Sequence, residues 1–218
     1  MTFIDVPTEQ TTAATDVVLS VIAMIVSFLT IQAGRINNIK KGRIWAWAFG
    51  LLAFAAFTGA VAHGFHMPAK LNYILWQPLN LALGLTVSLF VVGVVYDLTR
   101  GVLPKITLPL LLTIGTLFYV ITLVFPGIFL VFILYEAAAM LFSLVVYIVL
   151  STRHRLQGAS LMAAGILITM IAAAVQASEA IHVHCIWEFD HNGVFHLIQI
   201  VGILVLYAGL RLDLRGER

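Results

Sequence analysis

The sequence predicts an all-α membrane protein: a bundle of seven transmembrane helices with the N-terminus outside and the C-terminus in the cytoplasm. Three observations predict it: the composition, the long uncharged apolar runs, and the distribution of Lys and Arg. Of the 218 residues, 61% are hydrophobic and 10% are charged, whereas about a quarter of the residues in soluble domains are charged. Because no linker or internal repeat interrupts the pattern, we expect one transmembrane domain over residues 1–218.

The apolar runs favour helices over strands. Residues 106–125 and 158–175 contain no charged residue, and a helix of about 20 residues crosses the roughly 30 Å hydrocarbon core of a bilayer. A backbone in lipid must satisfy its own hydrogen bonds, which leaves helices and closed barrels. Barrel strands alternate apolar and polar residues, and these runs do not alternate, so helices are expected.

Seven runs are separated by Gly, Pro and Asn residues of the kind that end helices. The segment before the first run is polar and acidic and lacks the basic start of a signal peptide, so we expect this run to remain as a span. In chain order the predicted spans are Asp16–Gly34, Ile44–His66, Leu71–Tyr96, Lys105–Phe125, Gly127–Leu150, Gly158–His182 and Asn192–Leu212.

The basic residues predict the orientation. Of the 12 Lys and Arg residues, 11 follow the first, third, fifth and seventh spans, and only Lys70 lies opposite. Because short cytoplasmic loops are enriched in Lys and Arg, these connections are expected to be cytoplasmic. Merging or removing one span would break the alternation, so the pattern also supports the number of spans. Trp45 and Trp47, close to this side, are interpreted as an interfacial belt.

A polar cluster is predicted at the outer side, where six of the seven histidines fall. Glu136 lies about nine residues into the fifth span, roughly 13 Å deep. Ionisable side chains in lipid are costly, so they tend to face the bundle interior and find partners. We therefore expect a pocket that opens outward, with acid–base candidates Glu136 and Glu179, and with further polar lining from Asn80, Gln176, Asn192 and Gln199.

The same cluster predicts a metal site. Imidazole and carboxylate groups bind zinc, and a catalytic zinc takes three protein ligands and one water, whose pKa it lowers. A nearby carboxylate then acts as the general base. The candidate ligands are His63, His196, His182 and His66. Two structural alternatives remain open: histidines near helix ends often lie at the interface, and buried Glu, Asn and Gln residues often join helices by hydrogen bonds.

The arrangement resembles the CREST superfamily of seven-helix membrane proteins, which includes alkaline ceramidases and the progestin and adiponectin receptors. That family carries Ser-x-x-x-His on the second span, an acidic residue near the third, and His-x-x-x-His at the start of the seventh. His63 matches the first motif with Gly59 in place of Ser, and His196 matches the second with Asn192 in place of the first His. The resemblance implies a zinc site of three histidines and a water that hydrolyses lipid amide bonds.

Three functions follow from these patterns. The first is a zinc-dependent membrane hydrolase acting on a lipid amide or a related lipid bond in the outer pocket. The alternatives are a non-enzymatic receptor or small-molecule binding protein, and a haem-binding redox protein. Membrane lipid is the expected partner, and nucleic acid is not, because no basic run is present. A bacterial inner membrane or a eukaryotic organelle membrane is the expected location.

Overall fold

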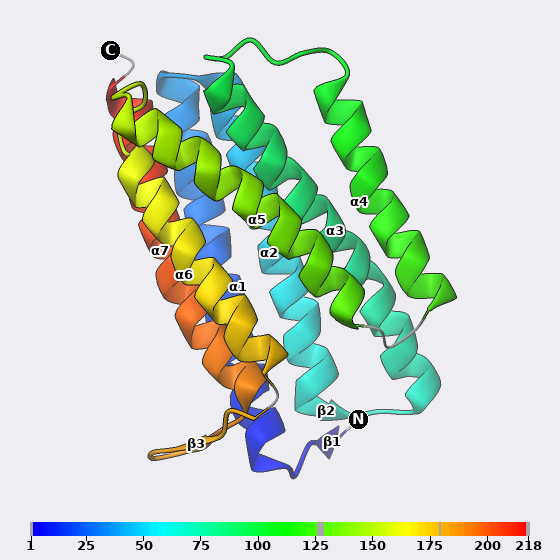
Figure 1. The fold of residues 1–218 in the computed structure, drawn as a ribbon. Coiled ribbons are helices and arrows are strands. Elements are labelled where there is room, and N and C mark those ends of the chain that lie inside the picture. The colour runs from blue at the N-terminus through cyan, green and yellow to red at the C-terminus, as the bar shows by residue number, and fades with distance from the viewer. Residues whose placement is uncertain (1, 126–128, 179, 217–218) are drawn as a thin grey trace.

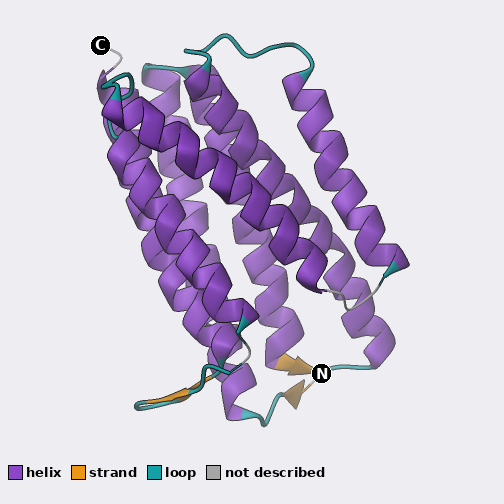
Figure 2. Cartoon of the chain, in the orientation of Figure 1, coloured by secondary structure: helices purple, strands orange, loops and turns teal. Residues whose placement is uncertain are grey.

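The computed structural model describes residues 2–125, 129–178 and 180–216. In that part of the chain, seven helices are long and apolar enough to cross a membrane, in agreement with the number predicted. They form one bundle in which successive helices run in opposite directions (Figures 1 and 2). The helices are α1 (Pro7–Ile36), α2 (Ile39–Gly64), α3 (Ala69–Leu98), α4 (Thr107–Val124), α5 (Phe129–Thr152), α6 (Ala159–Ala177) and α7 (His191–Gly216).

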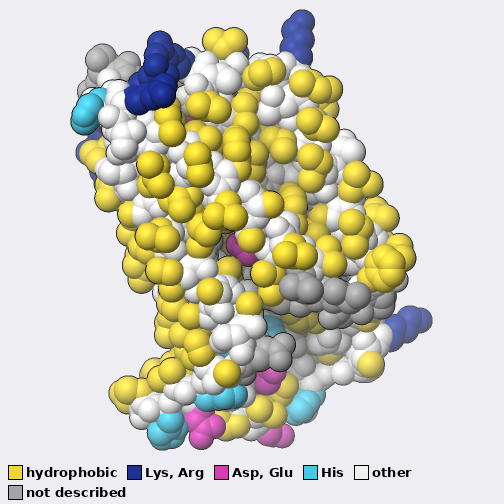
Figure 3. All heavy atoms as spheres, in the orientation of Figure 1, with side chains coloured by type: hydrophobic (Ala, Val, Ile, Leu, Met, Phe, Trp, Pro, Cys, Tyr) yellow, Lys and Arg dark blue, Asp and Glu magenta, His cyan; other side chains and the backbone are white. Residues whose placement is uncertain are grey.

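The two ends of the bundle differ in chemistry. At one end α2 and α6 finish and α3 and α7 begin, and we call it the histidine end; the opposite end is the basic end. Figure 3 shows His and acidic side chains gathered at the first and most Lys and Arg side chains at the second, with a hydrophobic surface between them. Two short antiparallel sheets lie at the histidine end: β1 (Thr2–Phe3) with β2 (Phe65–His66), and β3 (Val183–His184) with β4 (Glu188–Phe189).

Four of the predicted boundaries differ from the structure by four or more residues. Helix α2 begins at Ile39 instead of Ile44 and α7 ends at Gly216 instead of Leu212, and the start of α1 and the end of α6 also shift. Helix α1 begins at Pro7 instead of near Asp16, because a proline fits the first helical position and Glu9 lies favourably in the first turn. Helix α6 ends at Ala177 instead of His182. The chain then forms the β3–β4 hairpin, which projects from the bundle (Figure 1). His182 therefore lies in an exposed connection and outside the helix.

Close helix contacts depend on small residues. Where α1 and α2 meet at the basic end, a Cβ atom placed on Gly34 would lie 2.5 Å from the Cα of Gly42. Backbones approach this closely only where neither residue has a side chain, as is common between helices in membranes. The two glycines thereby fix how α1 and α2 cross.

The largest apolar cluster combines side chains from α1, α2, α3, α5, α6 and α7. Trp45 lies inside it with no exposed surface and packs edge-on against Phe90, with ring centroids 4.9 Å apart. The interfacial interpretation of Trp45 is therefore wrong. Trp47 is largely exposed on α2, because residues two apart on a helix point in nearly opposite directions.

A buried ionic cluster joins four helices at the basic end. Lys41 of α2 is almost fully buried, and its Nζ lies 2.6 Å from Oδ1 of Asp97 on α3 and also contacts Asp213 on α7. The hydroxyl of Tyr147 on α5 donates to Oδ2 of Asp97 at 2.8 Å. The sequence places these charges at the cytoplasmic boundary but does not reveal that they are buried together.

Candidate functional site: a polar cavity inside the bundle

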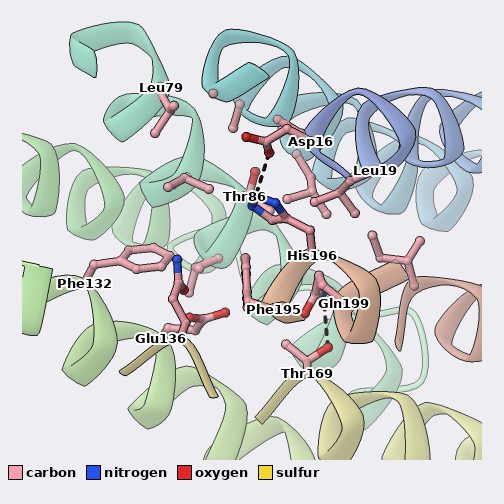
Figure 4. A pocket seen from close by; sticks show the side chains of 18 of the residues that line it. Asp16, Leu19, Leu79, Thr86, Phe132, Glu136, Thr169, Phe195, His196 and Gln199 are labelled. Atoms are coloured by element: carbon pink, nitrogen blue, oxygen red, sulfur yellow. Dashed lines mark hydrogen bonds and ion pairs between the residues drawn. The ribbon is translucent and has the colours of Figure 1, made fainter. Parts of the chain in front are cut away.

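A cavity of about 770 Å³ opens inside the bundle, between six helices (Figure 4). The described residues that line it come from α1, α2, α3, α5, α6 and α7, and most of them are apolar. A volume of this size with mainly apolar walls and a few polar groups is typical of small-molecule sites. The polar and titratable lining residues are Asp16, His63, Trp76, Thr86, Glu136, Thr169, Gln176, His191, Asn192, His196 and Gln199.

Asp16 reaches the cavity from the inner face of α1. This face carries Thr12, Asp16, Leu19 and Ala23, all buried and spaced four, three and four residues apart. Such spacing places side chains on one helix face. Asp16 thus occupies a position in a stripe that otherwise packs the core, and its side chain is only 5% exposed.

His196 of α7 is held through both ring nitrogens. Its Nε2 lies 3.2 Å from Oδ1 of Asp16 (Figure 4). Its Nδ1 lies 3.0 Å from the hydroxyl oxygen of Thr15. The order hydroxyl, imidazole, carboxylate resembles a nucleophilic triad. However, the Thr15 hydroxyl also donates to backbone carbonyls of α1, and Thr15 is not among the described residues that line the cavity. Thr15 and Asp16 therefore position the imidazole, and no accessible nucleophile results.

Gly59 of α2 makes room for the Asp16 carboxylate. A Cβ atom placed on Gly59 would lie 2.7 Å from Oδ2 of Asp16, which is shorter than any ordinary contact. The CREST pattern has a serine at this position, and a serine here would collide with the carboxylate. The glycine is therefore part of the local arrangement, since it allows α1 to bring a carboxylate to the histidine.

The rim of the cavity at the histidine end is fixed by further ion pairs and hydrogen bonds. Nδ1 of His63 lies 2.7 Å from Oε2 of Glu9, and its ring meets Trp76 edge-on at 5.7 Å between centroids. Asp190 lies at the start of α7, where its Oδ1 accepts hydrogen bonds from Thr12 Oγ1 and from the Gly193 amide, each at 2.9 Å. The second bond caps the helix.

Glu136 differs from the other acidic residues of the cavity. It has no hydrogen-bond or ion-pair partner among the residues that the structure describes. Its side chain extends from α5 toward the wall that contains Phe195 and Gln199 of α7 (Figure 4). There, Gln199 Nε2 donates to Thr169 Oγ1 at 3.3 Å, whereas the Oε1 atom of Gln199 and the Oγ1 atom of Thr86 are buried without a partner in the described part of the chain.

The cavity brings together six of the ten predicted site residues, but their position in its lining does not by itself assign them a role. These six are His63, Glu136, Gln176, Asn192, His196 and Gln199. Asn80 is not among the described lining residues, and His66 lies in β2 with Nε2 3.7 Å from Asp5. His182 is exposed beyond the end of α6, and Glu179 lies outside the described residues.

The side chains present do not fit the predicted three-ligand zinc site. Within the described ranges, no group of three or more His, Cys, Asp and Glu residues could hold a metal ion. Both nitrogens of His196 already have partners, and Nδ1 of His63 faces Glu9. Three of the four candidate histidines thus have separate partners, and His182 is exposed beyond α6, so we derive no metal-dependent step from them.

Sequence reasoning missed five polar lining residues of this cavity: Asp16, Trp76, Thr86, Thr169 and His191. For Asp16 a signal existed, because the residue continues the apolar stripe of α1 toward the N-terminus. For Thr86 no signal existed, since a threonine in an apolar span is ordinary. His191, one of the histidines near helix ends for which an interfacial position was left open, begins α7 and lines the cavity.

The comparisons with known proteins show which family the chain belongs to, and they do not show its function. Residues 11–215 match the model of a family of unknown function, DUF6962. The chain belongs to this family. The matched range contains every described residue that lines the cavity, so the cavity lies within the family's domain. No curated protein and no solved structure matches the chain.

Proposed function

We propose that this DUF6962 chain is an integral membrane protein, with its N-terminus outside and its C-terminus cytoplasmic, that binds a lipid-like small molecule. The observation that carries the proposal is the cavity of about 770 Å³, whose walls are apolar and whose polar groups gather on a few side chains. Such a lining suits a molecule with a long apolar body and a small polar head.

Membrane insertion is supported by the surface between the two ends of the bundle. Large apolar side chains such as Phe28, Phe57 and Leu134 are more than half exposed, and Figure 3 shows hydrophobic side chains covering this face. Soluble monomers rarely expose apolar patches larger than a few hundred Å². The orientation is supported by the excess of Lys and Arg in connections at the basic end.

The partners that the polar groups already have within the protein favour binding over catalysis. His196 and Asp16 hold each other, and the nearest hydroxyl, that of Thr15, is bonded to its own helix. A lipid amide hydrolase of the CREST type would need a third metal ligand, which the described residues do not offer. The receptor or binding-protein interpretation needs only the cavity itself.

Two neighbouring residues of α5 provide the test. Ile133 lines the cavity, whereas Leu134 is 62% exposed on the outer face. Native mass spectrometry of protein released from its membrane should detect a bound lipid-like molecule in the wild type and in Leu134→Trp. In Ile133→Trp, whose indole would occupy part of the cavity, the bound fraction should fall at least about fivefold. Equal occupancy in all three proteins, or none in any, would refute the proposal.

A further inference from the structure

The cavity also carries information about the head group of its ligand. Most hydrogen-bond donors of the wall are already used within the protein. The donor–acceptor pairs are Gln199 Nε2 with Thr169 Oγ1, Gln176 Nε2 with Asn192 Oδ1, and Trp76 Nε1 with Asn72 Oδ1. The ring nitrogens of His196 face Asp16 and Thr15. Among the buried polar groups of the described lining, those that can donate and have no partner are the Thr86 hydroxyl and the ring of His191, which lies about two turns before Gln199 on α7.

The acceptors, in contrast, are open. Gln199 is 93% buried, and its Oε1 has no hydrogen-bond partner among the described residues; Oγ1 of Thr86, a hydroxyl that can accept or donate, has none there either. The Glu136 carboxylate has no partner among the described residues. A buried acceptor without a donor costs free energy, so a ligand that supplies donors at this place is stabilised relative to one that does not.

The charges of the lining residues also favour a head group that supplies donors. Asp16 and Glu136 are the carboxylates among the described lining residues, and Asp16 faces His196. No Lys or Arg is among the lining residues of the described chain. An anionic head near Glu136 would meet a like charge with only histidines nearby, whereas a cation there has a carboxylate at hand. In a site of low dielectric this difference is large.

We infer that the ligand is a cationic amphiphile whose ammonium group binds between Glu136 and Gln199. An ammonium has three donors and no acceptor, so it suits the open carboxylate and carbonyl oxygens. Its apolar body lies toward the basic end, where the wall consists of apolar residues such as Phe49, Phe90, Met140 and Leu206. This inference rests on the proposed function and specifies the chemistry of the molecule that the cavity takes.

The head group also has a route from the lipid side. Helices α5 and α6 diverge toward the histidine end (Figure 1), and Glu136 on α5 is only partly buried. In Figure 3 acidic atoms reach the surface in the middle of the hydrophobic face. An amphiphile in the bilayer can therefore bring its head to the acid without crossing the polar rim.

The test compares three probes of equal chain length: dodecylamine, dodecanol and dodecanoate. Each is titrated against the full chain in phosphatidylcholine nanodiscs, and the apparent Kd is taken from the saturable rise in the unfolding midpoint. Empty nanodiscs correct for partition into lipid. We expect the amine to bind the wild type at least about tenfold more tightly than the alcohol, and dodecanoate to bind most weakly.

The matched variants are Glu136→Gln and Glu188→Gln, the second in the exposed β3–β4 hairpin outside the cavity. The amine should lose at least about tenfold in affinity in Glu136→Gln and keep its affinity in Glu188→Gln. The affinity for dodecanol should change little in either variant. If Glu136→Gln does not fold, the affinities of the three probes for the wild type still test the head-group inference.

The outcomes separate this inference from the proposed function. If all three probes bind equally, or if dodecanoate binds best, the head-group inference is wrong. Binding in the cavity still stands in that case, provided that Ile133→Trp abolishes the binding of the probes. If amine affinity is unchanged in Glu136→Gln, the inference is equally wrong. If no probe binds and Ile133→Trp has no effect, the proposed function fails with it.

Discussion

The buried ionic cluster at the basic end makes a strong prediction about stability. Replacing Lys41 with Met keeps the length of the side chain and removes its ammonium. The carboxylates of Asp97 and Asp213, both less than a tenth exposed, then lose the charge that lies 2.6 Å from the first and contacts the second. Water cannot replace the ammonium at this depth, so two like charges remain next to each other.

The magnitude follows from the burial. Removing one partner of a buried ion pair costs about 3–5 kcal/mol, because an uncompensated charge is left behind. Tyr147→Phe removes only the hydrogen bond to Asp97 and should cost about 1.5–3 kcal/mol. The triple variant Lys41→Met, Asp97→Asn, Asp213→Asn removes the ammonium together with both carboxylates. It should therefore be more stable than Lys41→Met alone.

The assay is equilibrium unfolding of the purified chain in mixed micelles, with the free energy of unfolding measured for all four proteins. The expected order of stability is wild type, Tyr147→Phe, and then Lys41→Met, with the triple variant above the last. A Lys41→Met protein within about 1 kcal/mol of the wild type would refute the reasoning. So would a triple variant less stable than the single one, because the cost would then not come from unpaired charge.

Three further predictions concern the histidine end and the topology. Gly59→Ala should lower the free energy of unfolding by about 1–3 kcal/mol, because its Cβ would lie 2.7 Å from Asp16, whereas Gly50→Ala on the same helix meets its nearest neighbour at 3.4 Å and should be tolerated. A membrane-impermeant maleimide should label the exposed native Cys185 in intact cells, and should label Gln157→Cys in a Cys185→Ser background only after permeabilisation. Elemental analysis should find no stoichiometric metal, since the described residues provide no group of three ligands.

Each of these has a result that would contradict it. Equal losses in Gly59→Ala and Gly50→Ala would mean that contact with Asp16 does not limit position 59. Labelling of Gln157→Cys in intact cells would reverse the orientation. One zinc per chain, lost when both cavity histidines, His63 and His196, are replaced by Ala, would restore the CREST-type hydrolase as the leading hypothesis.

The sequence alone determined the elements that depend on local properties. Length and continuous apolarity decide whether a segment can form a spanning helix, and the described residues form seven such helices where seven were predicted. The clustering of histidines at one end also follows from counting alternating spans. Among the boundaries that shifted, turn or cap chemistry competes with hydropathy at Pro7 and at the end of α6.

Tertiary structure decided which side chains meet. In a chain whose helices are apolar on nearly every face, hydropathy does not fix the rotation of each helix about its axis. Thus Trp45 is buried and Trp47 exposed, and Lys41 turned out to be buried although it had been counted with the loop residues. The pairing of Asp16 with His196 depends on the glycine at position 59 of a third helix. No local pattern encodes that coincidence, because it arises only when α1, α2 and α7 pack together.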